Sequence, residues 1–214
     1  MDIMELISML SRWGHLLFGI TWIGLLYYFN FIQGGYFKAA TPEALKDAKA
    51  KLAPEALWWF RWGAMGTFLT GLILLVGMFK LNQINDFIIV GATLGTVMFL
   101  NVWLVIWPNQ KVALGMVEGD GPTAAGKALL ASRTNTLFSG PMAFMMLSGG
   151  HFGGYADGIV NGIGSIGLWI ALGIVALLAI NGLKGKMGPI ETVRGVIVHS
   201  LVLTAVFVGI LKFL

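Results

Sequence analysis

Three histidines lie within or at the ends of long apolar stretches and are the residues best suited to chemistry. They are His15, His151 and His199, and the chain has no others. An ionisable side chain in hydrocarbon is costly, so each is a functional-site candidate. Two neutral imidazoles facing each other across a helix bundle can hold a b-type haem. We therefore predict non-covalent haem b with these histidines as candidate iron ligands. The alternative is that each only donates a hydrogen bond to a neighbouring helix.

The first apolar stretch, 12–32, places small and aromatic residues beside a histidine. At helical spacing His15, Gly19 and Trp22 share one face, so we include Gly19 and Trp22 among the cofactor-binding candidates. His15 lies about 15 Å below the outer surface at the helical rise of 1.5 Å per residue. His199 reaches a similar depth from the inner side, whereas His151 lies near the outer surface. Which two histidines pair is left open.

Two further polar residues are candidates. Arg61 stands within WWFRW, where it either anchors the helix at the inner interface or grips an anion such as a haem propionate. Asn101 lies in the middle of an apolar stretch and either bonds to another helix or contacts a ligand. The acidic residues are expected in loops, which argues against a carboxylate-lined proton path. Those considered are Glu43, Glu55, Glu118, Asp120 and Asp157.

The composition indicates that this chain is embedded in a lipid membrane. Of its 214 residues, 57% are hydrophobic and 11% are charged, with a mean hydropathy of +0.82. Soluble domains carry about 25% charged residues. The basic pI of 9.4 reflects loop residues that set topology, so we expect no nucleic-acid partner. The absence of cysteine excludes disulfides, iron–sulfur clusters and covalent haem attachment.

We predict an all-α, polytopic membrane bundle, a single domain over 1–214 with about six spans. The polar segment 34–55 separates the first two spans and is expected to be partly an interfacial helix, capped by Thr41 and Pro42. Pro54 is expected to open the second span and Pro108 to end the third. The amino terminus lacks the features of a signal peptide and is interpreted as the start of a mature helix. The spans cover about 4–31, 57–79, 87–107, 136–152, 159–183 and 192–214.

The basic residues are distributed unevenly between the two sides of this topology. Eleven of the fourteen Lys and Arg residues fall on one side, including Arg133 and Arg194. Arg12, Lys80 and Lys212 fall on the other. The positive-inside rule places both termini on the outer, periplasmic side of a bacterial inner membrane.

Several stretches resemble the membrane domain of bacterial membrane-bound, cytochrome c-linked urate oxidases. The resemblance covers the first four spans, about two thirds of the chain. It is most specific in PNQK, which directly follows the third span, and in the H-x-x-x-G-x-x-W-I-G run of the first span. WWFRW, GKALLASRTN and PMAFMMLSGGHF fit the same family. The matching positions are His15, Gly19, Trp22, Trp59, Trp62, Asn101, Pro108, Asn109, Gln110, Asn135, Pro141 and His151.

The resemblance implies a multi-helix membrane domain that oxidises urate and passes electrons to a cytochrome c. The chain also departs from the family pattern. Family members carry additional helices between the second and third spans. An acidic residue of the family is Gly63 here, and a family histidine is Thr134. Without cysteine, we expect a shortened form that lacks the fused cytochrome c domain.

The leading hypothesis is therefore a membrane-integral redox protein that binds b-type haem and relays electrons. It would act as a homo-oligomer or as a subunit of a larger complex, with cytochrome c as a possible partner. One alternative is a cofactor-free accessory or scaffold subunit. Another is a small-molecule channel or transporter, for which no inverted repeat is evident.

Overall fold

The computed structural model describes residues 2–151 and 164–214, and throughout these ranges the regular structure is helical. Three long continuous helices form the first half: α1, η1 and α2 (Ile3–Tyr27, Tyr28–Gln33, Gly34–Ala39), then α3, η2 and α4 (Pro42–Asp47, Ala48–Leu52, Ala53–Lys80), then α5, η3 and α6 (Asp86–Leu100, Asn101–Ile106, Trp107–Ala113). The second half contains α7 (Gly121–Ser148), α8 (Ile166–Lys184), the 3₁₀ turn η5 (Gly188–Ile190) and α9 (Val193–Phe213).

Five helices in the described ranges are long and apolar enough to cross a membrane: Ile3–Ala39, Pro42–Lys80, Asp86–Ala113, Ile166–Lys184 and Val193–Phe213. This confirms a multi-pass helical membrane protein. Five of the six predicted spans correspond to these helices, although 159–163 at the start of the fifth lies outside the described residues. The predicted fourth span, 136–152, is the exception. It is the second half of α7, a helix that starts at Gly121 and is not among these apolar helices.

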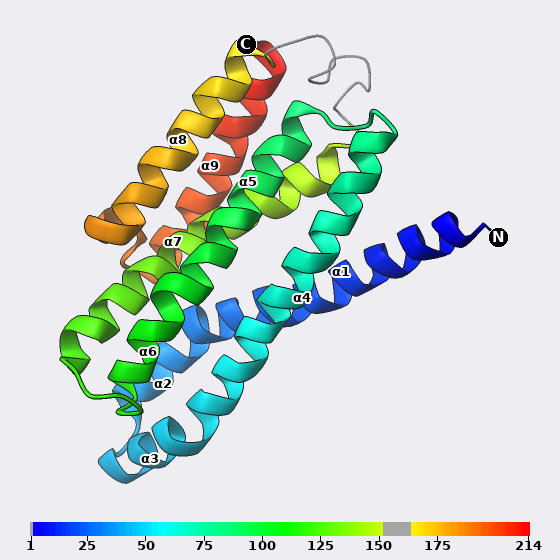
Figure 1. The fold of residues 1–214 in the computed structure, drawn as a ribbon. Coiled ribbons are helices and arrows are strands. Elements are labelled where there is room, and N and C mark those ends of the chain that lie inside the picture. The colour runs from blue at the N-terminus through cyan, green and yellow to red at the C-terminus, as the bar shows by residue number, and fades with distance from the viewer. Residues whose placement is uncertain (1, 152–163) are drawn as a thin grey trace.

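The helix α7 is polar because other helices surround it. It packs against α5, α6, α8, α9 and α1, and Figure 1 shows it crossing the bundle between α5 and the α8–α9 pair. Its buried residues include a nearly continuous run from Ala131 to Ser139. A helix shielded by protein rather than by lipid can carry polar side chains, provided that neighbouring helices satisfy them. This explains why hydropathy alone misjudged α7.

Pro54 lies in the first turn of α4, as expected for the start of the second span, although α4 continues without a break from the helix that begins at Pro42. Pro108 does not end the third span, contrary to the prediction, because the helix 86–113 continues through it. Each proline lies two residues after the end of a π-helical segment, η2 or η3. A proline lacks an N–H and clashes with the carbonyl four residues earlier in an α-helix. The wider π turn accommodates this residue locally and lets the helix continue.

The predicted cap in the polar segment 34–55 is confirmed. Thr41 is the N-cap of α3, and its hydroxyl accepts a hydrogen bond of 3.3 Å from the Ala44 N–H. Pro42 occupies the first helical turn, where a missing N–H costs nothing. This short helix precedes α4 at the lower end of the molecule in Figure 1.

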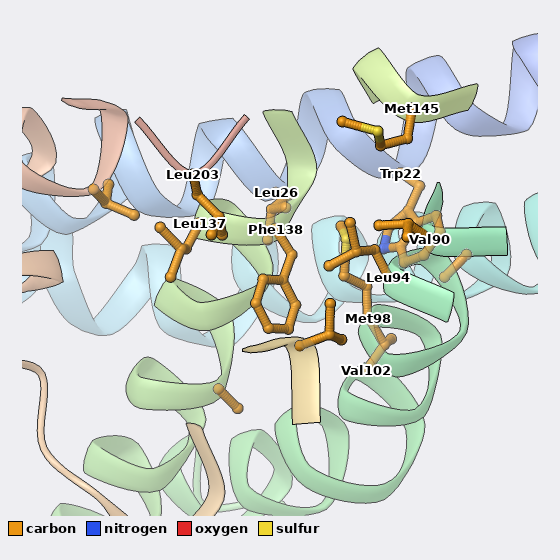
Figure 2. Packing of buried hydrophobic residues seen from close by; sticks show 14 of the residues in the cluster. Trp22, Leu26, Val90, Leu94, Met98, Val102, Leu137, Phe138, Met145 and Leu203 are labelled. Atoms are coloured by element: carbon orange, nitrogen blue, oxygen red, sulfur yellow. The ribbon is translucent and has the colours of Figure 1, made fainter. Parts of the chain in front are cut away.

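The hydrophobic core lies where α1, α5, α7 and α9 meet. Figure 2 shows Leu26, Leu137, Phe138 and Leu203 from three of these helices beside the α5 residues. Phe138 is fully buried. The helix α1 crosses α4 at a close contact, because a Cβ at Gly63 would lie 3.1 Å from the Trp22 backbone nitrogen. Gly63, which replaces the acidic residue noted above, therefore allows α1 and α4 to pack closely.

Candidate functional site

His15 is held between α1 and α4 in a defined orientation. Its Nδ1 lies 2.9 Å from the Thr67 carbonyl oxygen and 3.3 Å from Thr70 Oγ1. A carbonyl only accepts hydrogen bonds, so Nδ1 carries the proton and Nε2 keeps its lone pair. Gly71 leaves space for the ring, because a Cβ there would lie 3.0 Å from His15 Cε1. Metal-ligating histidines are commonly fixed by this kind of Nδ1–H bond to a backbone carbonyl.

The other two histidines lie elsewhere. His199 is exposed on α9, and its Nδ1 donates to the Gly195 carbonyl of the same helix at 2.8 Å. His151 is exposed just beyond the end of α7. The main packing partners of α9 are α7 and α8, whereas α1 packs chiefly on α4. The structure therefore does not bring His15 and His199 together as a pair within one chain.

The predicted common face of His15, Gly19 and Trp22 is confirmed, and it is the α1 face that packs on α4. A Cβ at Gly19 would lie 4.0 Å from Thr67 Cγ2. Trp22 is 2% exposed, and its indole N–H is buried without a partner. Gly19 and Trp22 thus belong to the α1 surface that packs on α4, and the imidazole itself lies against Thr67, Thr70 and Gly71.

An apolar pocket lies beside this face. It has a volume of about 600 Å³. Residues of α1 and α4 line it: Leu17, Phe18, Thr21, Trp58, Trp59, Trp62, Gly63, Met65, Gly66 and Leu69. Phe18 follows His15 by one helical turn. None of the three histidines is among the lining residues of this pocket.

Arg61 is fixed against another helix rather than free at the membrane interface. Its guanidinium carbon lies 3.8 Å from the centre of the Trp107 ring, and Nη1 donates to the Leu57 carbonyl at 3.4 Å. The Lys111 ammonium lies 5.6 Å from the same ring. Cations over an indole face are stabilised electrostatically. The contact joins α4 to α6, which favours the anchoring interpretation of Arg61.

Asn101 belongs to a buried group of polar side chains that we call the polar centre: Tyr27, Asn30, Asn101, Ser132, Asn135 and Ser139. Asn101 Nδ2 donates to Asn135 Oδ1 at 2.8 Å, and Asn135 Nδ2 donates to the Met98 carbonyl at 2.9 Å. Met98 lies just before η3, where the α-helical hydrogen-bond pattern changes to the π pattern. The interhelical-bond interpretation of Asn101 is thus the one the structure supports.

A second set of bonds joins α7 to the first helix. Asn30 Nδ2 donates to the Ser132 hydroxyl at 2.8 Å, and the Tyr27 and Ser139 hydroxyls are 2.9 Å apart. Of the six residues of this centre, only Asn101 was predicted from the sequence as a site candidate. The available signal was the polar run SRTNT, residues 132–136, inside an otherwise helical stretch.

Arg133 was also missed, because the prediction assigned it to a basic loop segment. It lies inside α7 and is 9% exposed. Of the acidic residues predicted to lie in loops, Glu118 does so and Asp120 is the exposed N-cap of α7, whereas Glu43 and Glu55 lie in the first turns of α3 and α4. Asp157 lies outside the described residues, as does position 152.

Comparison with known proteins supports one family. Residues 81–181 match the family model described as Urate oxidase N-terminal. No curated protein and no solved structure matches the chain. The matched segment begins just before α5 and ends within α8, so it includes Asn101 and Asn135 of the polar centre but not His15 or Arg61. Over residues 81–181, this helical membrane protein therefore resembles the N-terminal region of urate oxidases.

Proposed function

We propose that this chain is a membrane-integral redox protein of the urate oxidase type that binds b-type haem at His15 and relays electrons. The observation that carries the proposal is the Nδ1–H bond from His15 to the Thr67 carbonyl, which leaves Nε2 unprotonated and fixes the plane of the ring. The family match over residues 81–181 supports the redox chemistry.

The residues around His15 have separable roles in this proposal. The Thr67 carbonyl holds the imidazole as the Nδ1–H tautomer and makes Nε2 more basic. Trp58 and Trp62 line the neighbouring apolar pocket between α1 and α4. Haem held by His15 would supply a one-electron couple, and its ligand and apolar surroundings would set the potential.

We further propose that the basic end of the bundle faces the cytoplasm of a bacterial inner membrane. Figure 1 shows α3 and the connection from α6 to α7 at one end, with the turn from α4 to α5 and the carboxyl terminus at the other. The first end carries Lys46, Lys49, Lys51 and Lys111. Short loops rich in Lys and Arg stay on the cytoplasmic side.

The first experiment is a reduced-minus-oxidised absorption spectrum of the solubilised full chain. We expect an α-band that His15→Ala abolishes and His199→Ala retains. His199 is the matched control, because its exposed ring bonds only to its own helix. Thermal unfolding of both variants checks that each remains folded.

A folded wild-type chain without a haem signal after incubation with haem would overturn the proposal and favour the accessory-subunit alternative. A full signal in folded His15→Ala would overturn the assignment of the ligand. Electron relay is tested separately by urate-dependent reduction of added cytochrome c. If the haem-loaded chain does not carry out this reduction, the proposed urate oxidase activity is refuted.

A further inference from the structure

Arg133 is a buried cation whose charge the described protein leaves unpaired. Its side chain is 9% exposed, and Nε and Nη1 are buried without a hydrogen-bond partner. The ion pair found in the described residues joins Lys51 to Asp47, far along the chain from Arg133. A guanidinium cannot lose its proton in a protein, and burying it unpaired is strongly unfavourable. A bound anion would neutralise this charge and supply acceptors for Nε and Nη1.

The helical phase directs Arg133 toward the start of α9. Gly140 follows Arg133 by two turns on the same face of α7, and a Cβ there would lie 2.5 Å from Ser200 Oγ of α9. The helices α7 and α9 run in the same direction (Figure 1). Counting back seven residues from Gly140 on α7 and from Ser200 on α9 places Arg133 opposite Val193, the first residue of α9. Long side chains in a helix lean toward its N-terminus, so we expect the guanidinium to lean toward the segment before Val193.

That segment is itself electropositive. The first N–H groups of a helix lack intrahelical partners, and the helix dipole places about half a positive charge there. The Thr192 hydroxyl caps the Gly195 N–H at 2.9 Å. The surrounding stretch 184–194 carries Lys184, Lys186 and Arg194, and Glu191 is its one acidic residue. The turn η5 within this stretch packs against α7.

We propose that Arg133 and the N-terminus of α9 bind a phosphate group. The planar guanidinium fork and the backbone N–H groups of a helix N-terminus match the several acceptor oxygens of a phosphate. This chemistry is shared by the headgroup of an anionic phospholipid and by inorganic phosphate. Basic pockets between membrane helices on the cytoplasmic side bind such headgroups. The site does not depend on haem or on the proposed redox function.

The test measures thermal unfolding of the full chain in nanodiscs of three kinds: phosphatidylcholine alone, phosphatidylcholine with phosphatidylglycerol, and phosphatidylcholine with inorganic phosphate in the buffer. Binding at saturation is expected to raise Tm by about 5 °C. A rise only with phosphatidylglycerol assigns the site to the lipid headgroup, and a rise with phosphate alone assigns it to the free anion.

Arg133→Met tests the residue directly. We expect no anion response, together with a Tm in phosphatidylcholine alone that is at least that of wild type, because an unpaired buried charge has been removed. Arg61→Gln is the control for general attraction by basic residues and should respond as wild type does. An anion response retained in Arg133→Met would overturn the proposal. So would a wild-type Tm that is the same in all three nanodiscs, whether or not the variant folds.

Discussion

Asn135 is the residue on which the packing of α7 against α5 is expected to depend most. It is fully buried, accepts from Asn101 Nδ2 at 2.8 Å and donates to the Met98 carbonyl at 2.9 Å. Replacement by leucine, which has a similar branched shape, removes both bonds and leaves the buried Asn101 amide without its partner, whereas the Met98 carbonyl keeps the backbone N–H of Asn101.

The cost follows from the two lost bonds. Interhelical hydrogen bonds in membrane proteins contribute about 0.6 kcal/mol each, whereas a buried polar group left unsatisfied costs about 1–3 kcal/mol. Asn135→Leu is therefore expected to lower the free energy of unfolding by about 2 kcal/mol, between these limits. For a chain of this size such a change lowers Tm by about 4–8 °C.

The assay is thermal unfolding of the detergent-solubilised full chain, followed by circular dichroism. Asn109→Leu is the matched control, because Asn109 Nδ2 bonds at 2.8 Å only to the Val105 carbonyl of its own helix. The double variant Asn101→Leu/Asn135→Leu should lose less than the sum of the single losses, since the two side chains share a bond. An unchanged Tm in Asn135→Leu, or full additivity in the double variant, would refute the reasoning.

Two further predictions concern packing and a helix cap. Gly167→Ala should destabilise the chain by about 1–3 kcal/mol through overpacking, because its Cβ would lie 2.6 Å from the Ile210 carbonyl oxygen. Gly173→Ala, with no atom within 4 Å of its Cβ, is the control, and an equal loss of Tm in both would contradict the packing argument. Hydrogen bonds from the Thr123 hydroxyl and backbone N–H hold the pKa of Asp120 below its usual 3.8. A carboxyl whose pKa is lowered by folding stabilises the folded state fully above its unfolded pKa and loses that contribution as pH falls through the folded pKa. The Tm difference between wild type and Asp120→Ala should therefore be constant near neutral pH and shrink below about pH 4; a difference that grows with acid would reverse the assigned sign.

The local sequence was enough to show that this protein is helical and lies in a lipid bilayer. Runs of apolar residues long enough to cross a bilayer locate five of the helices, because every backbone group in hydrocarbon must be satisfied within its own segment. The Thr41–Pro42 cap is equally local, since one hydroxyl serves one backbone N–H nearby. The resemblance to urate oxidases was also available from the sequence, through runs such as PNQK.

Tertiary structure decided which side chains meet. The placement of His15 against Thr67, rather than opposite His199, depends on which helix packs on which, and the apolar pattern of a membrane helix carries little information about this. The same holds for Arg133 and Asn135, whose polarity indicated a loop or a boundary until α7 proved to be enclosed by other helices. The role of Pro108 was misjudged for a related reason. Packing between the helices of the bundle can stabilise a π turn, which the local preference of proline does not predict.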